Sequence, residues 1–229
     1  MSGRPPSQPP VVPARRDPFV IGLTGPIAAG KSTVAAMLRQ SGARVVDADH
    51  VYHALLTPGS ALPSRIGARF GSDVIAPDGG VDRAALARIV FADPRALADL
   101  DAITHPAIVA AVRQEIARAI EPVVVVEAVK LAQSALLDDI DALWLIDAEP
   151  EVRLRRLVAR SSLGETQARA RIAAQLEPLP PGVQPDLVID NSGSETASAS
   201  QVEAAWRELH LPSCSLESVG RATSERNVS

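Results

Sequence analysis

The chain has 229 residues, of which 46% are hydrophobic and 22% are charged. This composition excludes a wholly disordered or fibrous chain, and the length suits one α/β domain. Aromatic residues make up only 3% and the formal net charge is −4. The chain therefore lacks both the stacking residues and the basic surface of a general nucleic-acid binder, and we expect no nucleic-acid partner.

The cysteine count and the lengths of the apolar runs indicate where in the cell the protein is expected. Cys214 is the only cysteine, which predicts a reducing, cytoplasmic environment. No apolar run approaches the length of a membrane span, and the N-terminus shows no signal-peptide core, so no membrane partner is expected. The proline-rich and polar ends predict disordered tails at residues 1–17 and 212–229 around a single domain at 18–211.

Five short runs rich in β-branched residues alternate with helical patterns along this domain. The first is followed by a glycine-rich turn and by a helix from residue 31 to about 39, on which Val34, Met37 and Leu38 share one face. Continuously apolar runs separated by helices predict a five-stranded parallel sheet with helices on both faces. The predicted strands are residues 19–23, 44–47, 123–127, 143–147 and 186–190.

The interval from about 51 to 120 contains no convincing strand and predicts helices. Asp82 is a candidate cap for one helix, and Asp93-Pro94 starts another with its proline at the first position. His105-Pro106 predicts a helix break. Farther on, an i, i+4 apolar stripe indicates core packing: Ile108, Val112, Ile116 and Ile120.

A phosphate-binding motif directly follows the first predicted strand. Residues 25–32, GPIAAGKS, match G-x-x-x-x-G-K-[ST] at every fixed position. In such a loop, backbone N–H groups and the helix N-terminus converge on phosphates, the lysine reaches the β- and γ-phosphates, and the serine hydroxyl helps hold Mg²⁺. We expect ATP-type ligands with Mg²⁺ on Ser32. The nucleotide-binding residues are predicted to be Gly25, Ile27, Ala28, Ala29, Gly30, Lys31, Ser32 and Thr33.

Kinases, GTPases and transporter ATPases all use this loop. The chain contains no N-K-x-D guanine-reading motif and no L-S-G-G-Q segment, which disfavours the second and third classes. The second predicted strand ends in Val-Val-Asp47-Ala-Asp49, at the sheet edge where ligands of open α/β sheets bind. Asp49 is the candidate to accept the proton of an attacking hydroxyl, with Asp47 an auxiliary or metal-associated carboxylate. The alternative for both is helix capping.

Basic residues gather after the fourth predicted strand. Arg156 and Arg160 are i, i+4 neighbours that can stabilise the transferring phosphoryl from a closing lid. A solvated basic face is the alternative. Thr24 either hydrogen-bonds a substrate phosphate or merely ends the first strand. The four histidines show no metal-ligand spacing, so no transition-metal site is expected.

From about residue 21 to 209 the chain closely resembles the dephospho-CoA kinase family. The resemblance implies transfer of the ATP γ-phosphoryl group to the ribose 3′-hydroxyl of dephospho-CoA. The motifs that carry it, in order, are IGLTGPIAAGKSTVA, VVDADH, PGS at Pro58, RFG at Arg69, DG-x-VDRAALARIVF, ITHP at Ile103, RIAAQ ending at Gln175 and VIDNSGS from Val188.

The family's architecture implies a P-loop NTPase core, a helical substrate-binding insertion and an Arg-rich lid. These correspond here to residues 18–50, 121–149 and 186–211 for the core, 51–120 for the acceptor-binding region and 150–185 for the lid. Asn191, after the last strand, is expected near the nucleotide base. Lys31, Asp49, Arg156 and Arg160 are the expected catalytic residues, and the expected substrate-binding residues are Thr24, Asp47, His105, Glu127 and Lys130.

The chain departs from the family pattern after the third strand. Members usually carry a segment like Asp-Val-Pro-Leu-Leu-Phe-Glu, whereas this chain has Glu127-Ala-Val-Lys130-Leu-Ala-Gln133. A carboxylate is retained at the strand end, but a lysine enters. Two alternatives remain open: another P-loop nucleoside or nucleotide kinase, and a nucleotide-binding regulatory protein that has lost turnover. A monomer or weak oligomer is expected.

Overall fold

A parallel sheet forms the centre of the molecule. The computed structural model describes residues 18–161, 163–174 and 179–209, so the predicted tails lie outside the described residues. The strands follow the order β2-β3-β1-β4-β5, which confirms the predicted fold class. Each begins and ends within one residue of its predicted range: β1 (Phe19–Thr24), β2 (Arg44–Asp47), β3 (Val123–Glu127), β4 (Ala142–Asp147) and β5 (Leu187–Asp190).

Helices cover both faces of the sheet. One face packs against α1 (Lys31–Gln40) and α8 (Glu195–Glu208), whose buried Val34, Leu38 and Val202 join the sheet's apolar side chains. The other face packs against α5 (Pro94–Arg118) and the segment after β3, which forms the short 3-10 turns η2 (Leu131–Gln133) and η3 (Ala135–Asp139). Because both faces are buried, the strands are continuously apolar as expected.

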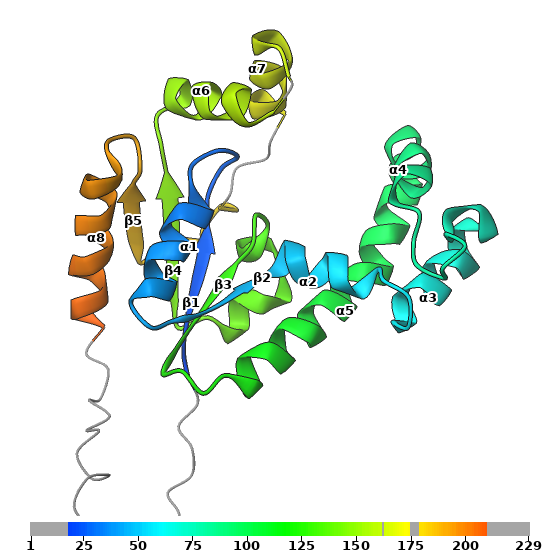
Figure 1. Cartoon of the computed structure of the whole chain (residues 1–229), viewed down its shortest axis with the longest axis horizontal. Helices are drawn as coiled ribbons and strands as arrows, with labels where there is room; N and C mark the ends of the chain where they lie inside the picture. The colour runs from blue at the N-terminus through cyan, green and yellow to red at the C-terminus, as the bar shows by residue number, and fades with distance from the viewer. Residues whose placement is uncertain (1–17, 162, 175–178, 210–229) are drawn as a thin grey trace, which may run out of the picture.

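The interval predicted to be helical contains no named strand among the described residues. It forms α2 (Ala48–Leu55), α3 (Ala61–Phe70), the 3-10 turn η1 (Ser72–Val74), α4 (Arg83–Ala92) and the first part of α5. These helices extend to one side of the sheet (Figure 1). Their own apolar cluster consists of Leu56, Leu62, Ile66, Val74, Leu86, Val90, Ala96 and Leu100.

Two expectations for this interval were wrong. Pro106 does not break a helix, because α5 runs through it from Pro94 to Arg118. Leu100 is buried in the helical cluster on one side of the proline and Val112 against the sheet on the other, so tertiary packing holds both halves in line. Ile120 also leaves the predicted stripe: it lies beyond the end of α5 and is 86% exposed.

A helical pair covers the carboxyl edge of the sheet (Figure 1). It consists of α6 (Pro150–Arg160) and α7 (Glu165–Ala173). Arg169 joins the two helices, because its guanidinium pairs with Glu151 and Glu165 at 2.9 Å each. Leu154 and Leu157 pack with Ala28 of the P-loop (residues 25–32). None of the helices in the described part of the chain is both long and apolar enough to cross a membrane.

Candidate active site

The P-loop turns sharply between β1 and α1. Gly30 precedes α1 with φ 99°, and a Cβ there would meet Nδ2 of Asn191 at 2.0 Å. Gly25 is equally constrained, since a Cβ would meet the Ile146 carbonyl oxygen at 2.1 Å. The first-turn N–H groups of a helix lack intrahelical acceptors, so the loop directs backbone donors and the positive end of α1 to one point. This is an anion-binding geometry.

Lys31 adds a side-chain cation to that point. Its Nζ donates a hydrogen bond to the Gly25 carbonyl oxygen at 3.0 Å, which keeps the ammonium folded over the loop. Burial lowers the pKa of Lys31, although the carboxylates of Glu127 and Asp49 oppose this effect. The lysine is therefore a partly desolvated cation beside acidic groups, and an incoming phosphate would replace a backbone carbonyl as its partner.

Two carboxylates lie side by side at the ends of neighbouring strands. Asp47 is the register partner of Glu127 in the β2–β3 pairing. Burial raises the pKa of the Glu127 carboxyl, and the Asp47 charge raises it further, while the hydrogen bond from Ser32 lowers it. Ser32 Oγ donates that bond to Glu127 Oε1 at 3.2 Å.

These oxygen donors fit Mg²⁺. The ion prefers hard oxygen ligands, and it usually takes one or two from the protein and the rest from phosphate and water. The Ser32 hydroxyl and the Glu127 carboxylate supply such a partial set, and the nearby Asp47 charge adds to the negative potential there. In the described part of the chain, no three His, Cys, Asp or Glu side chains gather as a complete metal site.

The two aspartates after β2 differ in their contacts. Oδ1 of Asp47 accepts from the backbone N–H groups of Asp49 at 2.9 Å and His50 at 3.2 Å, so Asp47 is the N-cap of α2. The Asp49 side chain makes no such bond, and Asp49 lines two cavities. The capping alternative therefore describes Asp47 and not Asp49.

Three adjoining cavities lie near the carboxyl ends of the strands, and two of them are lined by P-loop residues. The P-loop cavity, of about 530 Å³, lies between the loop, the strand ends and the helical pair; its lining includes Ala28, Lys31, Ser32, Asp49, Glu127, Val129, Arg160 and Arg171. The Asn191 cavity, of about 420 Å³, is lined by Ala28, Gly30, Thr33, Arg156, Arg160 and Asn191 among others. The helical cavity, of about 550 Å³, is lined by Asp49, Tyr52, Arg83, Leu86, Phe91, His105, Val129 and Lys130 among others.

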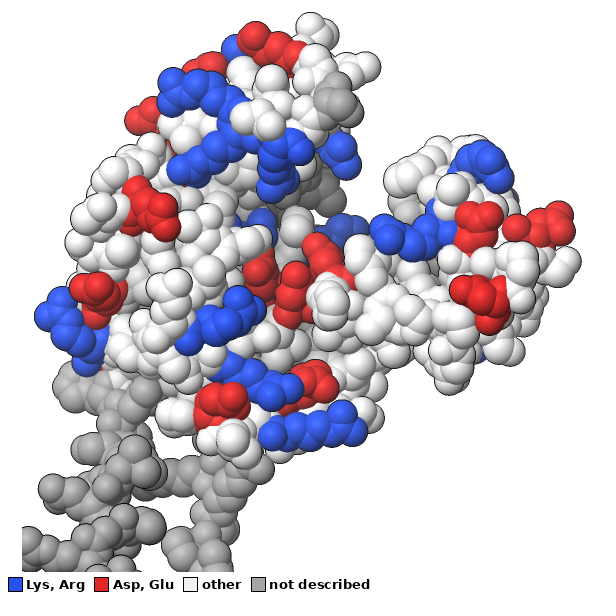
Figure 2. Space-filling model, viewed as in Figure 1, with Lys and Arg blue, Asp and Glu red and all other residues white. Residues whose placement is uncertain are grey.

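Shared residues connect these cavities. Asp49 and Val129 line both the P-loop cavity and the helical cavity, while Ala28 and Arg160 line both the P-loop cavity and the Asn191 cavity. Figure 2 shows the molecule hollowed between the helical pair and the projecting helices, with blue side chains on the helical pair and red ones on the floor. The three cavities thus form a row, and Asp49 lies where the P-loop cavity meets the helical cavity.

The two predicted arginines lie differently. Arg156 donates from Nη1 to the Ala29 carbonyl oxygen at 3.2 Å and from Nη2 to the Asn191 carbonyl oxygen at 2.8 Å, so its guanidinium braces the P-loop. Arg160 lines the P-loop cavity, and so does Arg171 of α7. The sequence reasoning missed Arg171, although it begins the RIAAQ segment that contributes to the family resemblance.

Asn191 is committed to the same brace. Its Nδ2 donates to the Ala29 carbonyl oxygen at 2.7 Å, and its Oδ1 accepts from Ser198 Oγ at 2.6 Å. The side chain is buried, yet it lines the Asn191 cavity. Asn191 therefore fixes the wall of a cavity that lies beside the P-loop, on the opposite side from Asp49.

Some predicted residues do not reach a cavity. Thr24 is fully buried at the end of β1, and its Oγ1 donates to the Val129 carbonyl oxygen at 3.3 Å. Of the two interpretations of Thr24, this contact favours the end of the strand over a substrate phosphate. Gly25 and Ala29 shape the P-loop from behind, since their carbonyl oxygens accept from Lys31 and Asn191. His105 and Lys130 do line the helical cavity.

Sequence comparison now adds to this geometry. The family model of dephospho-CoA kinase matches residues 19–197. The chain belongs to the dephospho-CoA kinase family. A dephospho-CoA kinase of Symbiobacterium thermophilum is 46% identical over 195 residues, covering 82% of this chain and 80% of the relative. One of Moorella thermoacetica is 43% identical over 195 residues, covering 83% and 92%.

Solved structures share the fold of this chain. A Thermus thermophilus protein superposes with a TM-score of 0.66 at 33% identity, covering 85% of this chain and 99% of that one. A dephospho-CoA kinase from Campylobacter jejuni gives a TM-score of 0.53 at 22% identity, covering 84% and 98%. The second likeness shows that the fold is shared.

Proposed function

We propose that this kinase transfers the γ-phosphoryl group of ATP to the 3′-hydroxyl of the ribose in dephospho-CoA, giving coenzyme A and ADP. Membership of the dephospho-CoA kinase family identifies the reaction class. The single observation that carries the mechanism is the position of Asp49, which lines both the P-loop cavity and the helical cavity. The first suits phosphates and the second is large enough for an acceptor.

In this proposal Asp49 orients the acceptor hydroxyl and takes its proton. The 3′-oxygen forms a bond to the γ-phosphorus while the bond from that phosphorus to the β–γ bridging oxygen breaks, and ADP leaves with the electron pair. The hydroxyl proton passes to the Asp49 carboxylate. Phosphoryl transfer depends mainly on positioning and charge stabilisation, so a carboxylate that aims the hydroxyl contributes chiefly by orientation.

The remaining polar residues surround the transferred group. Lys31 reaches the β- and γ-phosphates from the P-loop, and Arg160 and Arg171 approach from the helical pair. Ser32 and Glu127 are the residues that would hold Mg²⁺. When bound, this ion neutralises charge on the β- and γ-phosphates. The Asn191 cavity is then the place for the nucleoside of ATP.

An ADP-release assay across acceptors tests this function. We expect ADP formation with dephospho-CoA and much less with nucleosides or nucleoside monophosphates. Preference for a nucleoside or nucleotide acceptor would identify another P-loop kinase. ATP binding without transfer to any acceptor would identify a regulatory protein that has lost turnover, and either outcome rejects the proposal.

The assembly state and location are proposed on sequence grounds. We propose a monomer or weak oligomer, which sedimentation at micromolar concentration tests; a stable higher oligomer would contradict it. We propose a cytoplasmic location because the single cysteine, Cys214, matches a reducing compartment. Cell fractionation tests the location, and recovery in a secreted or membrane fraction would contradict it.

A further inference from the structure

Lysine is nearly absent from this chain. Of its 23 basic residues, 21 are arginines and only Lys31 and Lys130 are lysines. Lys31 is the lysine that the P-loop motif requires. Lys130 follows β3 and lines the helical cavity with Asp49. The chain therefore carries both of its lysines on adjoining cavities of one site, while arginine serves at every other basic position.

The backbone on either side of Lys130 is fixed. Before it, the Val129 carbonyl oxygen accepts the hydrogen bond from the buried Thr24 hydroxyl. After it, Leu131 is fully buried against β1, where a Cβ on Gly22 would meet Leu131 Cδ2 at 2.6 Å. A Cβ at residue 22 would therefore require the Leu131 side chain to shift. Lys130 is thus held between two anchors rather than on a loose loop.

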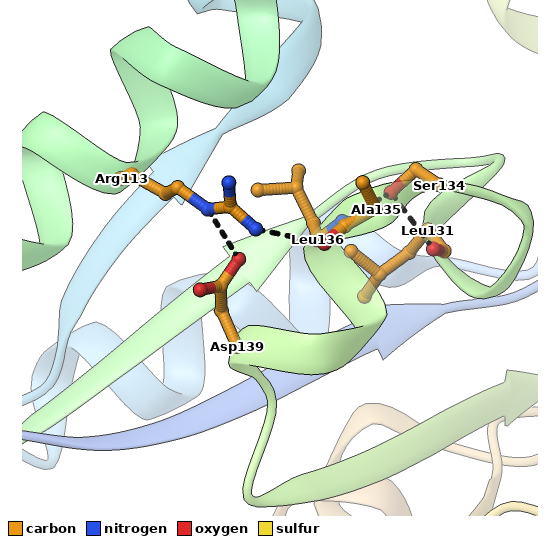
Figure 3. A network of polar contacts seen from close by, with 6 residues as sticks. All are labelled: Arg113, Leu131, Ser134, Ala135, Leu136 and Asp139. Carbon is orange, nitrogen blue, oxygen red and sulfur yellow. Dashed lines mark hydrogen bonds and ion pairs between the residues drawn. The ribbon is translucent and has the colours of Figure 1, made fainter. Parts of the chain in front are cut away.

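The following turns are tied to α5 as well (Figure 3). Ser134 Oγ donates to the Leu131 carbonyl oxygen at 3.0 Å. Arg113 of α5 donates from Nε to Asp139 Oδ2 at 2.7 Å and from Nη2 to the Ala135 carbonyl oxygen at 3.2 Å. The segment that departs from the family pattern therefore rests on a rigid support, which fixes where the Lys130 side chain starts.

The Lys130 ammonium has no fixed partner in the described part of the chain. Its side chain is exposed and makes no hydrogen bond or ion pair with any described residue. The acidic residues that line the same cavity are Asp49 and Asp101, and neither makes an ion pair with Lys130. A lone ammonium in a concave site suits an anionic ligand group, which it binds as a point charge.

We propose that Lys130 binds the diphosphate group of dephospho-CoA and so favours acceptors that carry this group. The inference rests on the proposed function. The 3′-hydroxyl and the 5′-diphosphate belong to the same ribose, and Asp49 and Lys130 line the same cavity. With the hydroxyl at Asp49, the diphosphate is the anionic part of the acceptor within that cavity. Lys130 is then a specificity residue that contacts substrate but not the transferred phosphoryl group.

Steady-state kinetics of Lys130→Leu and Lys130→Arg test the proposal. We expect Lys130→Leu to raise the KM for dephospho-CoA by about tenfold to a hundredfold, the usual effect of losing a charged hydrogen bond. The kcat and the KM for ATP should stay within about twofold, as should inhibition by adenosine, which carries no phosphate. Lys130→Arg should recover most of the loss. Thermal denaturation checks that both variants are folded.

The scarcity of lysine offers a second measurement that needs no turnover. Reductive methylation with formaldehyde modifies only Lys31, Lys130 and the α-amino group of this chain. Saturating dephospho-CoA should reduce the labelling of Lys130, and ATP should reduce that of Lys31, as read by peptide mass spectrometry. Adenosine should leave Lys130 labelling nearly unchanged.

The outcomes separate the two proposals. If the wild type makes no coenzyme A, the proposed function fails and the labelling still decides whether Lys130 contacts dephospho-CoA. If the wild type makes coenzyme A but Lys130→Leu keeps its KM for dephospho-CoA, the inference on Lys130 is overturned. A parallel fall in kcat with an altered KM for ATP also overturns it, because Lys130 would then act on the transferred phosphoryl group.

Discussion

At the scale of single residues, two aspartates of the same type and nearly the same position have different environments. One carboxylate oxygen of Asp47 accepts hydrogen bonds from two backbone N–H groups of α2, whereas Asp49 lines two cavities. A capping carboxylate already has donors and is poorly placed to take a proton. An uncommitted one beside the acceptor is suited to that task.

Asp49→Asn and Asp47→Asn form a matched pair. We predict that Asp49→Asn lowers kcat by about a hundredfold or more while the ATP dissociation constant changes little, because it removes the proton acceptor and keeps the shape. Asp47→Asn should have a smaller effect on kcat, since asparagine also caps helices well. Stopped assays and calorimetric ATP titration provide the measurements. Reversal of this order would assign the base to Asp47.

Glu127 gives a pH-dependent prediction. Its folded pKa lies above the ordinary value of 4.5, so over the range just above 4.5 the folded protein binds more protons than the unfolded chain. Stability must then fall as pH rises through that range. We predict that Glu127→Gln, measured by urea denaturation without ligands, gains stability over the wild type as pH rises from 4.5 to 7. A constant difference across this range would contradict the raised pKa.

Sequence reasoning reached most of the site residues but not their contacts. The motif located the P-loop, and the end of the second strand located Asp49, because ligands of open α/β sheets bind at that edge. The family resemblance pointed to Glu127, whose strand pairs with β2. Helical spacing could not tell that Arg156 faces the Ala29 carbonyl. That contact depends on how far α6 lies from the P-loop, which is a tertiary distance and leaves no local pattern.

At the scale of elements, the P-loop is braced by the turn between β5 and α8. Asn191 joins the Ala29 carbonyl to the Ser198 hydroxyl, and Arg156 bonds the carbonyl oxygens of both Ala29 and Asn191. Three segments far apart in sequence thus meet at Asn191 and Ala29. Satisfied buried networks of this kind fix geometry, and removing one member leaves the others without partners.

Asn191→Ala tests this brace. We predict a loss of about 1–3 kcal/mol in the free energy of unfolding, because the Ser198 hydroxyl and the Ala29 carbonyl oxygen lose a buried partner. The KM for ATP should rise more than the KM for dephospho-CoA. Ser198→Ala removes only one bond and should cost less. Urea denaturation and steady-state kinetics measure both effects; equal changes in the two KM values would argue against a role on the nucleotide side.

The strands were predictable to within one residue because each apolar run ends at a breaker or a charged residue. The continuation of α5 through Pro106 was not predictable from the sequence. Proline weakens a helix through local geometry, and the sequence around Pro106 carries that signal alone. Burial of Leu100 and Val112 in two separate apolar clusters outweighs it, and only the assembled fold shows those clusters.

At the scale of the whole molecule, the sheet, the helical pair and the projecting helices each supply one side of the row of cavities. The projecting helices have their own apolar cluster, separate from the two that flank the sheet. This arrangement supports the division into a nucleotide core, an acceptor-binding region and a lid, which stays a prediction.

Hydrogen exchange followed by mass spectrometry tests that division. We predict that ATP slows exchange in the P-loop and in α6, whereas dephospho-CoA slows it in α4 and in the segment after β3. The reason is that each ligand orders the elements that line its own cavity. Uniform protection of all elements by either ligand would contradict separate regions for the two substrates.

The junction at Asp49 and Val129 has a stereochemical consequence. These two residues line both cavities, so under the proposed function the ribose oxygen would attack the γ-phosphorus directly. A single in-line displacement inverts the configuration at phosphorus. ATP made chiral at its γ-phosphorus with oxygen isotopes should therefore yield coenzyme A of inverted configuration. Retention would mean two successive displacements, with a phosphorylated side chain between them.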